Sequence, residues 1–235
     1  MKKLIFLFLI SQLLLTACQN SKTETTTGDI APMEDISVTF SGIHFTKSAN
    51  DAIKYYNLTD SCLTVDAITG SNYFISPDGG RSEATAPILL TEIDNTQPFT
   101  FTTRLESKIS KIYDAGTVYI YLDNSRWLKY AFECDEKYRF RVVTVRTEGS
   151  SDDNNHDIIN QDYVFFRISS NTKQIGFYYS TDAVNWNLAR IYRNEYPAKI
   201  WLGISSQSPK EGNNPAHFSD MSLTHNYIND HRLGE

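Results

Sequence analysis

The sequence predicts an all-β protein, folded as a two-sheet antiparallel β-sandwich. From about residue 36 to residue 223, short runs alternate apolar and polar residues with the period of two that is typical of half-buried strands. Turn residues separate these runs, and no long stretch repeats its apolar residues with the period of a helix. Strands joined by turns, without intervening helices, favour a sandwich or jelly roll.

The expected strands follow one another along a single domain. In chain order they lie at residues 37–40, 62–67, 73–76, 98–106, 116–122, 127–133, 139–146, 163–169, 174–180, 186–192, 199–207 and 216–224. This length of chain is enough to bury one sizeable core, and no second linker or internal repeat divides it. We therefore expect one domain over residues 36–225 and a C-terminal tail over residues 226–235.

The N-terminus has the pattern of a secretory signal peptide. In MKKLIFLFLISQLLLTAC, two lysines precede an apolar run that ends at small residues and is too short to favour a membrane-spanning helix. Its last four residues, LTAC, resemble the bacterial lipobox, which implies cleavage after residues 1–17 and a diacylglycerol on Cys18. An ordinary signal peptide with an incidental cysteine is the alternative. We expect an extracytoplasmic protein anchored in the bacterial cell envelope, facing the periplasm or the cell surface, since two acyl chains anchor stably.

The segment after the lipidation site is polar and rich in threonine, which predicts a flexible tether over residues 18–35. The chain carries a net charge of −6 with scattered Lys and Arg, which argues against nucleic-acid binding.

Cys62 and Cys134 remain after lipidation. In an oxidising compartment they form a disulfide or stay as two separate thiols, and the sequence leaves both open. The sequence does not predict an oligomeric state.

The stretch YIYLDNSRWLKYAFE predicts a hairpin with one apolar face. With residues 124–126 as the loop, Leu122 faces Leu128 and Ile120 faces Tyr130, which places both pairs in the core. The other face then carries aromatic and charged residues, namely Tyr119, Tyr121, Trp127, Lys129, Glu133, Arg139 and Arg141, with Glu133 opposite Arg139. Aromatic rings beside charged groups on an open face suit sugar recognition. A solvated sheet face is the alternative.

Three polar motifs lie outside this hairpin. The run SSDDNNHD (150–157) predicts a loop, which either lines a ligand site, binds Ca²⁺ through Asp153, Asn155 and Asp157, or is simply solvated. It lacks the glycine and distal glutamate of an EF-hand, and we otherwise expect no cofactor. STDAVNW (180–186) predicts a hairpin turn capped by Ser and Asp side chains. In QSP (207–209), Gln207 offers a donor and an acceptor to a sugar hydroxyl, or simply ends a strand.

Several of these motifs together resemble one family. The runs YDAGTVYIYLDNSRWLKYAFE, VVTVRTEGSSDDNN, YYSTDAVNW, GISSQSP and HFSDMSL match, in order and spacing, the domain of unknown function 1349 family, also called regulation-of-enolase-like. The resemblance covers about residues 63–223 and implies a concanavalin A-like lectin/glucanase jelly roll. The family's motif positions are Asp114, Gly116, Asp123, Trp127, Lys129, Glu133, Ser151, Asp152, Asp153, Tyr179, Ser180, Asp182, Trp186, Gln207, Ser208, Pro209, Phe218 and Asp220. Ala183 stands where the family usually has glycine, which suggests a different turn there.

No complete catalytic motif is present. Retaining glucanases need two carboxylates close together, and neither Glu92-Ile93-Asp94 nor Glu133-Cys134-Asp135 is followed by the second glutamate of that motif. We therefore expect a non-catalytic, carbohydrate-binding envelope lipoprotein. The expected ligand-binding residues are Tyr121, Asp123, Trp127, Lys129, Glu133, Asp152, Asp153 and Gln207. One alternative is a divergent polysaccharide hydrolase or lyase with Glu133 as acid/base near Lys129 or Asp152. Another is a structural envelope protein that engages a protein partner.

Overall fold

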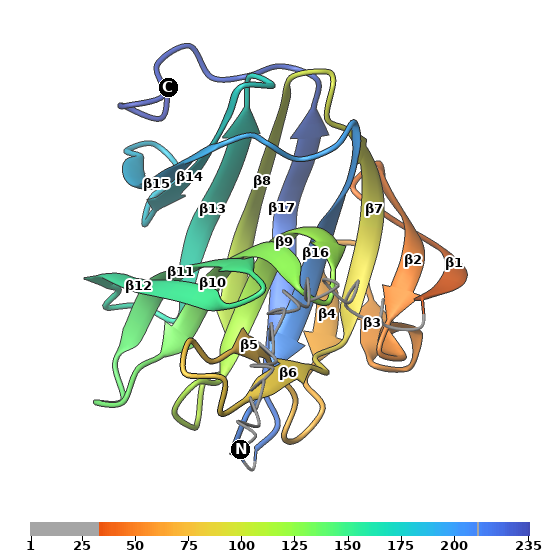
Figure 1. The fold of residues 1–235 in the computed structure, drawn as a ribbon, viewed down its shortest axis with the longest axis vertical. Coiled ribbons are helices and arrows are strands. Elements are labelled where there is room, and N and C mark those ends of the chain that lie inside the picture. Colours follow the sequence, from red (N-terminus) through yellow and green to blue (C-terminus); the bar gives the residue numbers. More distant parts are fainter. Residues whose placement is uncertain (1–32, 211) are drawn as a thin grey trace, which may run out of the picture.

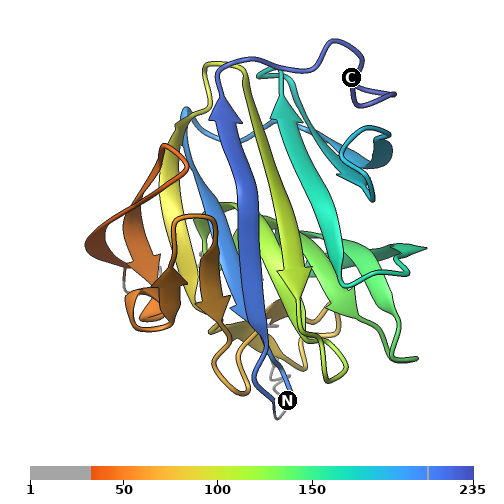
Figure 2. The same cartoon turned by 180° about the vertical axis from the view of Figure 1, so that it is seen from behind.

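The computed structural model describes residues 33–210 and 212–235, which form two antiparallel sheets packed face to face (Figure 1). The eight-stranded sheet contains, in spatial order, β1 (Met33–Phe40), β2 (Ile43–Ala49), β7 (Ile88–Asp94), β16 (Lys199–Gln207), β9 (Ala115–Asp123), β10 (Arg126–Cys134), β11 (Phe140–Glu148) and β12 (Ser151–Ile158). The seven-stranded sheet, seen from behind in Figure 2, contains β15 (Asn187–Arg193), β14 (Gln174–Ser180), β13 (Tyr163–Ser170), β8 (Phe99–Ser107), β17 (Pro215–Thr224), β4 (Leu63–Asp66) and β3 (Tyr56–Leu58).

The remaining elements are a small hairpin of β5 (Tyr73–Ile75) and β6 (Ser82–Ala84) and one 3₁₀ turn, η1 (Ala52–Lys54). The predicted sandwich is confirmed, and each expected strand overlaps an observed one. The predictions for β14 and β16 have the observed bounds. No helix in the described part of the chain is long and apolar enough to cross a membrane.

Five strands were not expected: β2, β3, β6, β7 and β12. β7 reads ILLTEID, and its first four residues are buried on both faces, so alternation appears only at its end, where Glu92 and Asp94 are exposed. β12 has the opposite character, because it is the polar run that we expected to be a loop. It pairs with β11 at the sheet edge, where it exposes most of its side chains on both faces.

The core lies between the two sheets. Tyr130 of β10 stacks on Phe166 of β13 and Phe177 of β14, with ring centroids 3.8 and 4.7 Å away. Gly116 lets the sheets approach closely, because a Cβ there would lie 2.6 Å from Leu105 Cδ1. Val118, Ile120, Leu128, Tyr130 and Phe132 all belong to this core, as the predicted apolar face requires.

The strand register differs from the prediction by two residues. Leu128 pairs with Ile120, not Leu122, and Glu133 pairs with Arg141, not Arg139. The hairpin turn is shorter than expected, and the register shifts between Arg126 and Trp127. Since side chains alternate faces with a period of two, this slip leaves the assignment of faces intact.

The sandwich begins a few residues before the expected N-terminal bound. Residues 1–17, Cys18 and most of the tether lie outside the described residues, but Met33 to Asp35 already belong to β1 and pair with β2. The C-terminal tail packs on the seven-stranded sheet, where Arg167 Nη1 donates to Gly234 O at 2.5 Å and Tyr178 Oη to His231 O at 2.9 Å. Cys62 and Cys134 are two separate free thiols, not a disulfide.

Candidate ligand-binding pocket

The β5–β6 hairpin folds over part of the outer face of the eight-stranded sheet (Figure 1). The Tyr73 ring packs edge-on against Tyr119, Tyr121 and Trp127 at centroid distances of 5.6, 6.0 and 5.3 Å. All four rings are fully buried. The expectation that Tyr121 and Trp127 lie on an open face is therefore wrong, because a distant hairpin covers the aromatic half of that face.

A cavity of about 210 Å³ opens beside this covered half. Its lining comes from the hairpin and the turn before it, from β10, β11, β12 and β16, and from the loops next to β9 and β10. The lining residues are Asn72, Phe74, Arg81, Tyr113, Lys129, Glu133, Glu136, Val143, Val145, Asp153, Asn155 and Gln207.

The structure thus brings together four of the eight predicted site residues, namely Lys129, Glu133, Asp153 and Gln207. Tyr121 and Trp127 are buried beneath Tyr73. Asp123 caps the β9–β10 turn, where its Oδ1 accepts from Ser125 N at 2.8 Å and Ser125 Oγ at 2.7 Å. Asp152 is exposed on β12 and does not line the cavity.

Lys129 forms the buried floor of the pocket. Its side chain is 2% exposed, and Nζ donates to Tyr73 O at 2.9 Å and to Gln207 Oε1 at 3.3 Å. Burial lowers the pKa of Lys129, although Glu133 and Asp153 act in the other direction. A buried ammonium group that binds a strand carbonyl and an amide is held in one place, so it presents a fixed donor to the pocket.

Glu133 lies on the same face of β10 as Lys129, with Ala131 between them, and has weak hydrogen bonding. Among the residues that the structure describes, its carboxylate accepts from Gln207 Nε2 alone, at 3.5 Å. Burial, together with the nearby carboxylates of Asp153 and Glu136, raises the pKa of Glu133 to about 7, while Lys129 opposes this rise. In the described part of the chain, Lys129 and Glu133 make no direct ion pair, and Gln207 bridges them.

Gln207 is held by its own contacts and by its neighbour in the QSP motif. Its Nε2 also donates to Tyr113 O at 3.2 Å. Ser208 Oγ donates to Asp114 Oδ1 at 2.7 Å, while Asp114 Oδ2 accepts from Lys111 N at 3.0 Å. Asp114 and Ser208 are both fully buried. This pair fixes the end of β16, and with it the amide between the two charges.

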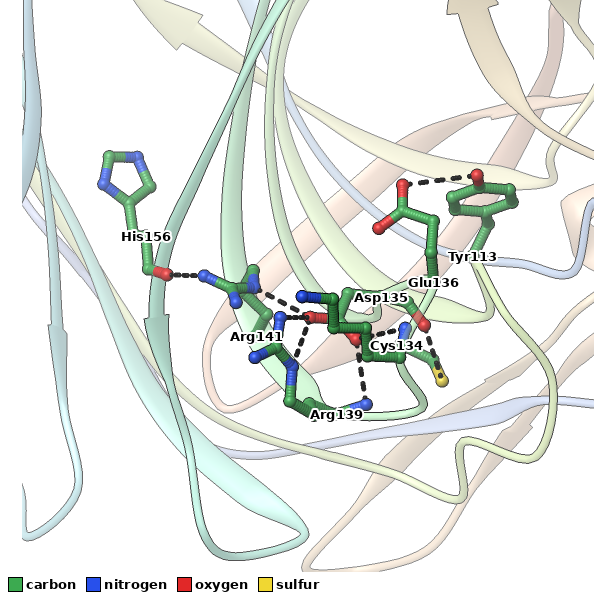
Figure 3. Close-up of polar contacts among 8 residues, drawn as sticks. Tyr113, Cys134, Asp135, Glu136, Arg139, Arg141 and His156 are labelled. Atoms are coloured by element: carbon green, nitrogen blue, oxygen red, sulfur yellow. Dashed lines mark hydrogen bonds and ion pairs between the residues drawn. The ribbon is translucent and has the colours of Figure 1, made fainter.

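The second carboxylate of the Glu133-Cys134-Asp135 run has a structural role (Figure 3). Asp135 accepts from Arg139 Nε at 2.8 Å and from Arg141 Nε at 3.1 Å. Burial acts to raise the pKa of Asp135, but the hydrogen bonds from Arg139, Lys137 and Arg141 outweigh it and hold this pKa well below its usual range. Asp135 thus clamps the β10–β11 turn, and it does not line the pocket.

Two other motifs have structural roles. Asp182 Oδ1 accepts from Val184 N and Asn185 N, both at 2.8 Å, which confirms the capped turn in STDAVNW. Ala183 has φ 63°, so it keeps a left-handed conformation suited to glycine, and the expected change of turn is wrong. In the polar run for which Ca²⁺ binding was one of three alternatives, Asp157 accepts a hydrogen bond from Tyr179 Oη. No group of three or more His, Cys, Asp or Glu suited to a metal occurs among the described residues.

Sequence reasoning missed most of the pocket walls. Phe74 and Tyr113 supply aromatic surface, Val143 and Val145 supply aliphatic surface, and Arg81 and Glu136 are exposed lining residues at the rim. Phe74 lies in a predicted strand and Tyr113 directly precedes the Asp114 motif position, but neither run of sequence indicates a cavity. A pocket made by a hairpin folding onto a distant strand leaves no periodic signal.

The chain belongs to the family described as protein of unknown function (DUF1349), whose model matches residues 50–226. No curated protein matches it in sequence. A functionally unknown protein from Saccharomyces cerevisiae has a similar structure, with a TM-score of 0.70 and 19% identity over 77% of this chain and 96% of that one.

Longer glycoside hydrolase proteins share the fold over part of their length. The GH43 BlXynB protein from Bacillus licheniformis matches with a TM-score of 0.62 and 14% identity over 82% of this chain. The Bacteroides ovatus Xyloglucan PUL GH43B protein matches with a TM-score of 0.60 and 13% identity over 83% of this chain. This chain spans 38% of each of these two proteins. At these identities the likeness concerns the β-sandwich fold.

Proposed function

We propose that this protein binds carbohydrate in the pocket above Lys129 and Glu133, without catalysis of its own. The observation that carries the proposal is the polar floor. A buried ammonium, an amide and a poorly partnered carboxylate lie side by side, linked through Gln207 by contacts of 3.3 and 3.5 Å. Hydroxyl groups donate and accept at once, so adjacent hydroxyls of a sugar match such a row of donors and acceptors.

The walls suit a sugar as well as the floor does. Phe74 and Tyr113 offer ring surface, and Val143 and Val145 offer aliphatic surface, to the apolar C–H groups of a pyranose. The cavity volume of about 210 Å³ is below the range of about 300–1,000 Å³ for drug-sized ligands. We therefore assign the pocket to one sugar residue, such as a chain end or a side branch.

The proposal is tested by glycan-array binding of the wild-type chain and of Lys129→Met. Methionine fills the space of the lysine stem but cannot donate, so binding is expected to fall about tenfold or more through loss of a charged hydrogen-bond donor. Lys199→Met is the matched control, because Lys199 is exposed on β16 and does not line the pocket. The proposal fails if the wild type binds no glycan, or if both variants bind as the wild type does.

A second candidate function is a divergent hydrolase or lyase with Glu133 as the acid/base. It is favoured by the raised pKa of Glu133, about 7, which is where a general acid works best near neutral pH. Asp153 is the other pocket carboxylate from the predicted set. Release of reducing ends from a panel of polysaccharides, absent in Glu133→Gln, would favour this candidate over simple binding.

The proposed setting is the bacterial cell envelope, with a lipid on Cys18 as the anchor. This proposal rests on the LTAC run alone. Metabolic labelling with a fatty-acid analogue tests it: the wild type is expected to carry the label and Cys18→Ser to lose it. A structural role with a protein partner remains a further alternative, for which cross-linking pull-down is the test.

A further inference from the structure

The hydrogen bonds within the pocket leave its carboxylates more available to a ligand than its cationic groups. Lys129 Nζ already donates to two protein oxygens, those of Tyr73 and Gln207. The Arg81 guanidinium lies 3.5 Å from the Glu83 carboxylate. Lys129 is therefore engaged by protein acceptors before any ligand arrives, whereas Arg81 is half-exposed and makes one long contact through Nε.

The pocket carboxylates are engaged much less. Glu133 accepts one long contact of 3.5 Å from Gln207, and Glu136 accepts one of 3.3 Å from Tyr113 Oη. In the described part of the chain, no group donates a hydrogen bond to the Asp153 carboxylate. Three carboxylates face two cations around one cavity, so a carboxylate excess remains for a ligand to neutralise.

Resting on the carbohydrate-binding function proposed above, we infer that the pocket selects a sugar that carries a free, protonated amino group. The ammonium donates to Glu133 and to the rim carboxylates Glu136 and Asp153. The remaining donor of Lys129 and the amide of Gln207 bind ring hydroxyls. An ammonium beside Phe74 and Tyr113 also gains from the negative faces of the rings.

The alternative sugars fit less well. An N-acetylated amino sugar has no cation and would leave Glu133 with an uncompensated charge. A uronic acid would bring a fourth carboxylate among three, and it would find two of the three Lys129 N–H groups already donating to protein oxygens. The raised pKa of Glu133 agrees with a preference for amino sugars over N-acetylated and acidic ones. A ligand cation would relieve the repulsion that Glu133 experiences from Asp153 and Glu136.

The test is isothermal titration calorimetry of the full chain at neutral pH with glucosamine, its disaccharide, their N-acetylated counterparts, glucose and glucuronic acid. The free amines are expected to bind about tenfold or more tightly than the acetylated forms, because a charge-assisted hydrogen bond is added. Glu133→Gln is expected to abolish this preference. Asp153→Asn, on an exposed strand where folding is not at risk, is expected to reduce it.

Glu92→Gln is the matched control for general attraction of a cation to an acidic protein, because Glu92 is exposed on β7 and away from the pocket. It is expected to keep the full preference. The inference is overturned if the acetylated, neutral or acidic sugars bind as tightly as the amines, and the proposed binding function then stands. If none of these sugars nor any glycan on the array binds, the proposed function itself falls.

Discussion

Replacing Glu133 with glutamine is expected to change the stability of the protein in a pH-dependent way. The pKa of Glu133 rises from 4.5 to about 7 on folding, chiefly through burial. Between these values the folded chain binds more protons than the unfolded chain, so the stability contributed by Glu133 is complete below about pH 4.5 and is lost as the pH rises through about 7. Glutamine resembles the protonated side chain at every pH.

The size of the effect follows from the same shift. Each pKa unit corresponds to about 1.4 kcal/mol, so a rise from 4.5 to about 7 corresponds to at most about 3 kcal/mol. Glu133 is partly exposed to the pocket, where water screens its charge, and we expect about 1–2 kcal/mol. Glu133→Gln should match the wild type near pH 4 and exceed its free energy of unfolding by this amount above about pH 8.

Urea unfolding of the wild type and Glu133→Gln from about pH 4 to about pH 9 measures this difference. Titrating groups away from the pocket are shared by both proteins, so their contributions cancel. Lys129 is the exception, because Glu133 acts to raise its pKa and the glutamine does not. Glu92→Gln removes an exposed carboxylate that pairs with Lys199 at 2.5 Å, and as a surface control it should show only a small difference. A Glu133→Gln protein that is less stable than the wild type above about pH 8, or a difference that is constant with pH, would refute the reasoning.

Three further predictions concern the scaffold, each measured as the free energy of unfolding in urea. Ala183→Gly should stabilise the protein by about 0.5–1 kcal/mol, because Ala183 holds φ 63°, and an unchanged or lower stability would contradict this. Gly116→Ala should destabilise it by about 1–3 kcal/mol, since the new Cβ would lie 2.6 Å from Leu105 Cδ1, and a neutral result would count against the close sheet contact. Asp135→Asn should cost about 2–3 kcal/mol at neutral pH, because it loses charge-assisted bonds from Arg139 and Arg141. The depressed pKa of Asp135 makes this stability present above about pH 4 and lost in stronger acid, so the deficit of the variant should shrink there.

Sequence alternation was enough to assign the faces of β9 and β10. Val118 and Ile120 point into the core and Lys129 and Glu133 point away from it, even though the register was shifted by two residues. A period of two survives such a slip, whereas pair assignments such as Glu133 with Arg139 do not. Alternation did not reveal β7, whose first four residues are buried on both faces, or the polar edge strand β12.

The candidate site could be predicted only in part, because its form depends on contacts between distant segments. Lys129, Glu133 and Gln207 were found from side-chain chemistry and family motif positions. That Tyr73 would cover Trp127 was not encoded in any local pattern, since the two residues belong to separate hairpins. Aromatic residues on a non-core face therefore predicted an exposed platform where the structure has a second, smaller core.

The central claim is that ligand binds at the pocket over Lys129 and Glu133 and not on the aromatic residues beneath Tyr73. The most direct measurement is glycan binding by Lys129→Met compared with Trp127→Phe, which keeps an aromatic ring in the fully buried Trp127 position. If ligand binds over Lys129 and Glu133, Lys129→Met loses binding and Trp127→Phe retains it. Binding that survives in Lys129→Met and is lost in a folded Trp127→Phe protein would contradict it.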